Sequence, residues 1–370
     1  MRRARLVLAD GTCFEGEAFG AKSVAIGEVV FTTGMTGYQE VLTDPSYAGQ
    51  IVTMTAPEIG NTGANAVDDE HRGHTPSVAG FIVRNASITT SNHRADESLD
   101  AYLERHGVVA LSGIDTRRLV RILREKGSQN GAIGSASAEE LADAARRAPS
   151  MEGLDLVGRV KPDAVEPFAE HTPDEFRTLH TYGPVEGAHV VAIDLGMKRN
   201  ILRSLVDLGA RVTVAPPTLT ASEVLALGPD GVFVSNGPGD PAAVTYAIET
   251  LRDLVGKKPL FGICLGHQLL ALAAGARTYK LKFGHRGLNQ PVKDLDTGRV
   301  EITSQNHGFA VDLDTLPKDA RATHVHLNDG TSEGLVIPDA NAFSVQFHPE
   351  AAAGPHDTLH LFERFARNIA

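Results

Sequence analysis

The chain has 370 residues, and its 46 acidic and 35 basic side chains give a formal charge of −11. The acid excess argues against a protein that binds nucleic acid, and the absence of tryptophan together with only 5% aromatic residues points the same way. No stretch approaches the roughly 20 apolar residues of a membrane-spanning helix, and the apolar run after the basic N-terminus is too short for a secretory signal. Two cysteines cannot form a disulfide framework, so we expect a cytoplasmic protein. A length of 370 residues suggests about two domains.

Composition divides the chain near residues 150 and 188. Residues 151–188 contain four prolines and no sustained periodicity, which is typical of a linker with short structured pieces. Residues 1–188 carry 18 basic and 27 acidic side chains, whereas residues 189–370 carry 17 and 19. The acid excess, which usually indicates a solvated surface, therefore belongs to the first part. We predict a first domain over 1–150, a linker over 151–188 and a second domain over 189–370.

The first domain carries signals of both strands and helices. Apolar alternation on both sides of Asp10-Gly11 predicts a hairpin of Arg5–Ala9 and Thr12–Ala18. Recurring glycine and threonine over residues 27–65 favours irregular strands and loops over helices. Two helices with capping-box signals follow: Thr116–Lys126, opened by Ser112 and Asp115, and Leu141–Ala148, opened by Ser137 and Glu140. The pattern indicates an α+β domain and leaves its topology open.

The second domain alternates short apolar runs with helical periodicity. We expect strands over 190–195, 211–215, 231–235, 259–263 and 343–347, and helices over 201–208, 221–227, 241–255, 267–274 and 358–368. This alternation predicts right-handed βαβ units, and therefore an α/β fold with a doubly wound, mostly parallel sheet.

One segment of the second domain joins a buried strand directly to a helix through a cysteine. Cys264 lies between Gly262 and Gly266, the thiol counterpart of the nucleophile elbow found in hydrolases. The tight turn requires small neighbours, and the N-terminus of the helix would stabilise a thiolate and supply N–H groups for an oxyanion, with Leu265 as the expected donor. A buried structural cysteine between two packing glycines is the plain alternative.

The predicted strand at residues 343–347 leads to His348 and Glu350. A thiolate needs a base that titrates near neutrality, and the base needs a carboxylate to fix its tautomer. Both residues follow a strand, and ligands of open α/β sheets bind at the carboxyl ends of the strands. His348 is therefore the first candidate for the base.

Two further patterns have weaker signals. The loop 235–241, Ser-Asn-Gly-Pro-Gly-Asp-Pro, would let the backbone approach a substrate, although these residues also form ordinary turns. His356 and His360 lie four residues apart on a predicted helix, and His324 and His326 lie on a predicted strand. Because the sequence offers no apparent third ligand beside either pair, we expect no metal site there.

The three segments 261–270, 235–241 and 348–350 together resemble the class I (triad-type) glutamine amidotransferase domain, over about residues 189–370. In the first domain, the segments 34–40, 42–47, 59–63 and 113–117 resemble the small (glutaminase) chain of carbamoyl-phosphate synthases. The segments 282–287 and 305–310 fit the same family, so the resemblance covers essentially the whole chain.

This resemblance assigns roles to individual residues. It implies Cys264 as nucleophile, His348 as general base and acid, and Glu350 as the partner that orients the histidine. It also implies a set of glutamine-binding residues: Ser46, Gly237, Gly239, Leu265, Gln268, Asn306, Gly308 and Phe309.

The resemblance also implies the reaction and its partner. The chain would hydrolyse L-glutamine through a cysteine thioester and pass ammonia to a large chain, as a heterodimer or larger assembly, for arginine and pyrimidine synthesis. No cofactor is expected on this chain, since no phosphate-binding loop occurs, and ATP and Mg would bind to the large chain. The alternatives are a glutaminase subunit of anthranilate or aminodeoxychorismate type, against which the first domain argues, and a non-catalytic regulatory module, against which the intact Cys264–His348–Glu350 set argues.

Overall fold

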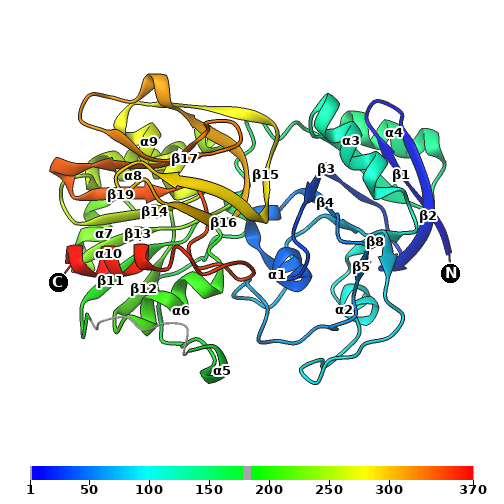
Figure 1. Ribbon diagram of the computed structural model, residues 1–370, viewed down its shortest axis with the longest axis horizontal. Helices are drawn as coiled ribbons and strands as arrows, with labels where there is room; N and C mark the ends of the chain where they lie inside the picture. Colours follow the sequence, from blue (N-terminus) through cyan, green and yellow to red (C-terminus); the bar gives the residue numbers. More distant parts are fainter. Residues whose placement is uncertain (1, 178–184, 370) are drawn as a thin grey trace. The chain divides into compact units, whose positions relative to one another are not determined.

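The computed structural model describes residues 2–177 and 185–369, which form two units (Figure 1). The first unit comprises Met1–Leu154 with Lys282–Gly287, and the second comprises Asp155–Leu281 with Leu288–Ala370. This division falls between Leu154 and Asp155, near the start of the predicted linker 151–188. The strand β10 (Glu166–Phe168) of that linker pairs with β12 (Arg211–Ala215) in the sheet of the second unit. Residues 178–184 of the linker lie outside the described residues.

A closed barrel of seven strands forms the first unit, in the order β1-β2-β8-β6-β4-β3-β9. The strands are β1 (Arg2–Leu8), β2 (Cys13–Gly20), β3 (Ala25–Thr32), β4 (Gln50–Met54), β6 (Gly80–Ile82), β8 (Val109–Ser112) and β9 (Gln129–Gly134), with a separate pair of β5 (Glu58–Ile59) and β7 (Asn85–Ala86). Successive side chains alternate between the two faces of a strand. One apolar cluster, which includes Leu6, Phe31 and Ile133, takes side chains from all seven strands and therefore fills the barrel.

The helices of the first unit are α1 (Tyr38–Thr43), α2 (Leu99–Arg105), α3 (Thr116–Lys126) and α4 (Ala138–Arg147). The predicted hairpin is confirmed by β1 and β2, and the capping box of Ser137 and Glu140 is present at α4. The cap of α3 was predicted wrongly, because Asp115 itself accepts from the backbone N–H of Arg118. The expectation of strands and loops rather than helices over 27–65 was wrong for α1, since buried side chains fix this six-residue helix in place.

The second unit contains a ten-stranded sheet in the order β10-β12-β11-β13-β14-β19-β18-β17-β15-β16. The strands beyond β10 are β11 (His189–Ile193), β12 (Arg211–Ala215), β13 (Gly231–Val234), β14 (Leu260–Ile263), β15 (Arg277–Asp294), β16 (Val300–Asp312), β17 (Arg321–His326), β18 (Ser332–Ile337) and β19 (Ala342–Val345). The five strands from β12 to β19 are parallel, which confirms the doubly wound core. The pairs on both sides of this core, β10 with β12 and β18 with β19, are antiparallel.

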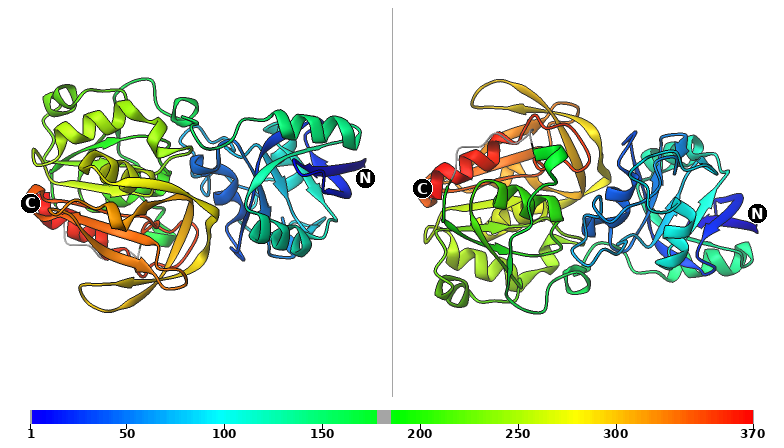
Figure 2. Two further views of the ribbon diagram at one scale, coloured as in Figure 1. Left: turned by 90° about the horizontal axis from the view of Figure 1, so that it is seen from above. Right: turned by 90° about the horizontal axis from the view of Figure 1, so that it is seen from below.

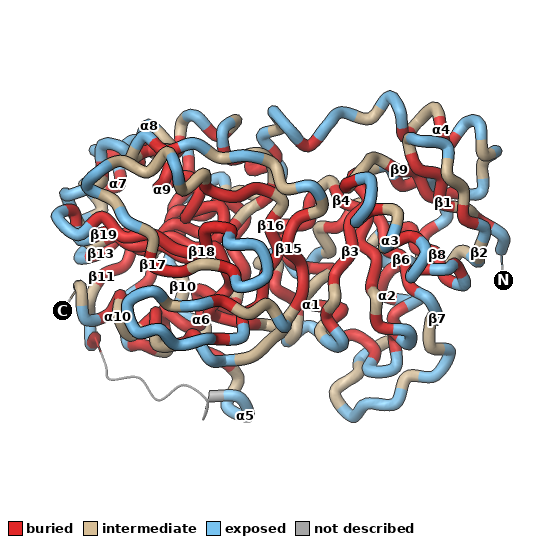
Figure 3. Tube along the Cα trace, turned by 45° about the horizontal axis from the view of Figure 1, so that its top comes forward, coloured by how far each residue is buried: buried red, intermediate tan, exposed pale blue. Residues whose placement is uncertain are grey.

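Helices cover both faces of this sheet (Figure 2). α6 (Arg199–Asp207) and α10 (His360–Ile369) pack on one face, and α7 (Ala221–Ala226), α8 (Thr245–Leu254) and α9 (Leu265–Ala274) pack on the other. α5 (Asp174–Arg177) is a single short turn. The central strands are buried along their length (Figure 3).

α10 begins at His360, so the prediction that His356 and His360 share a helix was wrong. Among the described residues, no helix combines the length and the hydropathy needed to cross a membrane.

Candidate active site

The strand β14 meets the helix α9 at a sharp turn occupied by Cys264. Cys264 has a φ of 55°, a positive value that costs a non-glycine residue free energy and is typical of functional sites. A Cβ atom on Gly266 would lie 2.3 Å from the carbonyl oxygen of Val234, and one on Gly262 would lie 2.8 Å from the carbonyl oxygen of Gly266. Both distances are too short for any side chain, so the predicted need for small neighbours is confirmed.

The N-terminus of α9 presents backbone N–H groups beside the cysteine. Gly266 N–H donates to the carbonyl of Ser235 at 2.9 Å, and Gln268 N–H donates to the carbonyl of Cys264 at 3.2 Å. Leu265 is the first residue of the helix, where N–H groups have no intrahelical acceptor. Within the described part of the chain, this N–H has no backbone acceptor, which leaves it available to an oxyanion.

His348 and Glu350 form a buried pair just after β19. The Nδ1 atom of His348 lies 2.7 Å from Oε1 of Glu350, which fixes the ring orientation and leaves Nε2 for the reaction. Burial opposes the charged imidazole, but Glu350 and then Cys264 favour it, and the pKa of His348 is raised to about 10. Since Cys264 contributes to the raised pKa, its thiol lies close to the imidazole ring. The Nε2 atom of His348 has no hydrogen-bond partner among the residues described.

Lys198 completes this cluster and was missed in the sequence. Its Nζ lies 3.0 Å from Oε1 of Glu350 and donates to the carbonyl of Ala351 at 2.6 Å, and its side chain is only 4% exposed. Burial raises the pKa of Glu350, but the attraction of Lys198 and then of His348 outweighs burial and lowers it to about 2. One signal was available: Lys198 closely follows β11, at the same edge of the sheet as Cys264 and His348.

The strand β16 carries three of the predicted glutamine-binding residues and brings one of them, Asn306, to the cysteine. The Sγ atom of Cys264 lies 3.6 Å from the carbonyl oxygen of Asn306, and Gly308 and Phe309 follow on the same strand. Hydrogen bonding between the backbone N–H of His348 and the carbonyl of Ser304, at 2.8 Å, ties β16 to the base as well. The second unit thus brings Cys264 after β14, Asn306 on β16 and His348 after β19 together.

Gln268 has a more limited role than the sequence indicates. Its Nε2 donates to the carbonyl of Phe309 at 2.8 Å and to Oε1 of Gln346 at 2.9 Å. Both amide hydrogens are therefore used within the protein, and only Oε1 remains to accept from a substrate.

The remaining predicted residues are Gly237, Gly239 and Ser46. A Cβ on Gly237 would lie 2.4 Å from the carbonyl oxygen of Leu195 and 2.8 Å from Cδ2 of Leu265, so only glycine fits there. Gly239 has a φ of 95° and forms an isolated β-bridge with Asp155. Ser46 belongs to the first unit, where it is buried and its N–H donates to Asp44 Oδ1 at 2.8 Å.

The chain is similar to known proteins over both of its units. Residues 191–368 match the glutamine amidotransferase class-I family, and residues 6–133 match the CPSase domain of the carbamoyl-phosphate synthase small chain. The carbamoyl phosphate synthase small chain of Rhodopirellula baltica is 51% identical, over 100% of this chain and 96% of its own. That of Syntrophotalea carbinolica is 54% identical, over 98% of this chain and 97% of its own. The chain belongs to the carbamoyl phosphate synthase small-chain family.

Membership of this family fixes the class of enzyme. The chain is the glutamine-hydrolysing small subunit of a carbamoyl phosphate synthase. A solved structure of a glutamine amidotransferase from Thermotoga maritima is 19% identical, with a TM-score of 0.36, and covers 45% of this chain and 77% of its own.

Proposed function

We propose that Cys264, His348 and Glu350 carry out glutamine hydrolysis in this chain. The observation that supports this assignment is the Nδ1–Oε1 contact of 2.7 Å in a buried pair, beside a cysteine held in a strained turn. The Cys264 thiolate attacks the side-chain carbonyl of glutamine, and the oxyanion accepts from the N–H of Leu265. His348 then protonates the leaving ammonia, so that a γ-glutamyl thioester remains on the sulfur.

The second half of the reaction uses the same residues. His348, neutral after it has given up its proton, takes a proton from water, and the hydroxide attacks the thioester carbonyl. The C–S bond breaks and glutamate leaves. Cys264 is then again a thiolate, and His348 holds the proton that it took from water. The raised pKa of His348 favours its imidazolium form before the attack, and this cation pairs with the Cys264 thiolate.

Glutamine recognition is assigned to Ser46, Gly237, Gly239, Leu265, Gln268, Asn306, Gly308 and Phe309. For Gln268 the bonds to Phe309 and Gln346 support one direction of contact, in which Oε1 accepts from the α-ammonium group of the substrate. The bonds of Nε2 also hold Phe309 in place beside Asn306.

A large synthetase chain would be the partner. Small-chain membership supports this partnership, and the ammonia would pass to that chain, which would bind ATP and Mg and form carbamoyl phosphate for arginine and pyrimidine synthesis. We assign the complex of this chain and the large chain to the cytoplasm, in keeping with the two free cysteines of this chain.

The test is Cys264→Ser in the complex reconstituted with the large chain, with Cys13→Ser as the matched control. Glutamine-dependent synthesis should vanish in Cys264→Ser, while synthesis from added ammonium survives. Cys13→Ser should keep both activities, because this half-buried residue lies in the hairpin of the first unit. Loss of both activities in Cys264→Ser, or of neither, would overturn the assignment.

A further inference from the structure

The side-chain amides of Gln268 and Gln346 contact each other in the interior of the second unit. Gln268 lies on α9, four residues after Cys264, and Gln346 lies directly after β19, two residues before His348. Both side chains are buried, with exposed fractions of 3% and 0%. Nε2 of Gln268 donates to Oε1 of Gln346 at 2.9 Å and to the carbonyl of Phe309, on β16, at 2.8 Å. These two bonds join the elements that carry the nucleophile, the base and part of the predicted glutamine site.

The partners of the Gln268 amide determine which way it faces. The carbonyl of Phe309 can only accept, so the Gln268 atom beside it is the nitrogen. Since that nitrogen can only donate, the Gln346 atom 2.9 Å from it is the oxygen. The orientation of both amides therefore follows from the chemistry of their partners, and Oε1 is the end of the Gln268 amide that both bonds leave unused.

The nitrogen of the Gln346 amide is unsatisfied. It is buried and has no hydrogen-bond partner among the described residues, so Gln268 is the partner of this side chain within that part of the chain. The backbone of Gln346 is fixed separately, because its N–H donates to the carbonyl of Glu333 at 2.9 Å. A buried donor without a partner costs free energy, and an apolar side chain at this position would avoid the cost. Folding alone therefore does not explain an amide here.

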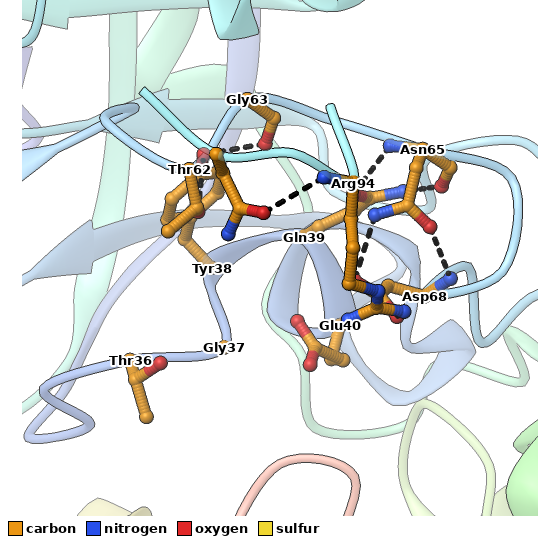
Figure 4. Close-up of a pocket in the computed structure, with 11 residues that line it drawn as sticks. Thr36, Gly37, Tyr38, Gln39, Glu40, Thr62, Gly63, Asn65, Asp68 and Arg94 are labelled. Carbon is orange, nitrogen blue, oxygen red and sulfur yellow. Dashed lines mark hydrogen bonds and ion pairs between the residues drawn. The ribbon is translucent and has the colours of Figure 1, made fainter. Parts of the chain in front are cut away.

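Gln39 of the first unit shows how a glutamine amide is bonded when it serves the fold. It lies in the wall of a polar cavity (Figure 4), where its Nε2 donates to the carbonyl of Asn65 and, at 2.7 Å, to Oδ1 of Asp69. Its Oε1 accepts from the N–H of Asn65 at 3.0 Å. Gln39 is thus bonded to the protein at both ends of its amide, whereas Gln268 is bonded only at its nitrogen.

We propose that Gln346 is a positioning residue, which makes Gln268 select the α-ammonium group of the substrate. By accepting from Nε2, Gln346 keeps the oxygen of Gln268 available to the ligand, and an oxygen accepts from an ammonium group but repels a carboxylate. Rotation of the Gln268 amide by half a turn would exchange its oxygen and nitrogen and break both bonds. Glutamine binds only the fraction of chains that present the oxygen, so a smaller fraction raises KM. This inference rests on the glutamine site proposed above.

Steady-state kinetics of glutamine hydrolysis, in the complex reconstituted with the large chain, test the proposal. Gln346→Met keeps the length of the side chain but removes the acceptor. It should raise KM for glutamine about two- to tenfold, the effect of one net hydrogen bond on an equilibrium, with kcat nearly unchanged. Gln346→Asn, which is one methylene shorter, should act in the same way. Thr250→Val is the matched control: it also removes one hydrogen bond of a buried side chain in the second unit, from Oγ1 to the carbonyl of Leu219 at 2.8 Å, and should leave KM unchanged.

Glutaramate, which is glutamine without its α-amino group, provides a second measurement. The ratio of kcat/KM for glutamine to kcat/KM for glutaramate should fall in Gln346→Met, because only glutamine carries the group that Gln268 selects. A general distortion of the site would instead reduce both values alike. The double variant Gln268→Leu/Gln346→Met should have the same KM as Gln268→Leu, since Gln346 acts only through Gln268.

The proposal fails on any of three outcomes. An unchanged KM in Gln346→Met would mean that Phe309 alone fixes the Gln268 amide. Equal losses of kcat/KM for glutamine and glutaramate would mean that Gln346 supports the fold of the site and not its selectivity. A higher KM in the double variant than in Gln268→Leu would mean that Gln346 acts independently of Gln268. The proposed function is tested separately, since it fails only if Cys264→Ser loses both activities or neither.

Discussion

Replacing Glu350 with glutamine removes the carboxylate that holds two buried cations together. Oε1 of Glu350 lies 2.7 Å from Nδ1 of His348 and 3.0 Å from Nζ of Lys198, and none of the three side chains is more than 4% exposed. At an effective dielectric constant of about 20, unit charges at these distances attract by roughly 6 kcal/mol per pair. Desolvation offsets part of this attraction, and removal of one partner from a buried pair costs about 3–5 kcal/mol.

We therefore expect Glu350→Gln to lower the free energy of unfolding by about 3–5 kcal/mol at pH 7, measured by urea unfolding with circular dichroism. The exposed Glu249→Gln on α8 serves as the matched control and should change it by less than about 0.5 kcal/mol. The double variant Lys198→Met/Glu350→Gln should be more stable than Glu350→Gln alone. In the double variant His348 is the one member of the cluster left, and it can remain neutral.

Two results would refute this reasoning. A loss below about 1 kcal/mol for Glu350→Gln would mean that the cluster behaves like an exposed ion pair. Additive losses in the double variant would mean that Lys198 and Glu350 do not interact.

Three further predictions concern the turn, the pH dependence and glutamine recognition. Gly266→Ala places a Cβ 2.3 Å from a carbonyl oxygen and should cost about 1–3 kcal/mol of stability and abolish ammonia release, whereas Gly158→Ala, with open space around it, should change neither; thermal unfolding and an ammonia assay decide. The pKa of His348 is raised from 6.5 to about 10, so its stabilisation should be complete below pH 6.5 and lost as the pH rises through about 10. The pKa of Glu350 is lowered from 4.5 to about 2, so its stabilisation should be complete above pH 4.5 and lost as the pH falls through about 2. The difference in urea midpoint between wild type and His348→Asn should therefore be largest from pH 4.5 to 6.5, and a difference independent of pH would contradict the two shifts. Gln268→Leu removes the Oε1 contact proposed to accept from the α-ammonium group, and a hydrogen bond to a charged group is worth about 1.5–3 kcal/mol, so KM for glutamine should rise about ten- to a hundredfold with a smaller change in kcat. The two internal bonds of Nε2, to Phe309 and Gln346, are lost as well. A lower kcat at unchanged KM would speak against a role in recognition.

Local sequence predicts the part of the site that depends on local geometry. The turn at Cys264 needs glycines two residues before and after it, and the clash distances at Gly262 and Gly266 show why. The capping box at Ser137 is equally local, since its two partners are three residues apart. Such features follow from a few neighbouring residues, so a single sequence is enough to find them.

Features that depend on distant pairings could not be predicted. Lys198 and Glu350 are separated by most of the second unit in sequence, and their contact exists because β11 and β19 lie in one sheet. The barrel closes when β1 pairs with β9, with Leu6 opposite Ile133, and nothing near either residue specifies that register. The helix α1 was missed for a related reason, because a six-residue helix gets its stability from tertiary burial rather than from its own sequence.

The most direct test of the central claim is detection of the covalent intermediate. The complex is mixed with labelled glutamine, quenched in acid, digested and examined by mass spectrometry. We predict a γ-glutamyl group on the peptide that contains Cys264, and none on the peptide that contains Cys13. Glutamine turnover without an adduct on Cys264, or with one on Cys13, would contradict the assignment of Cys264 as the nucleophile.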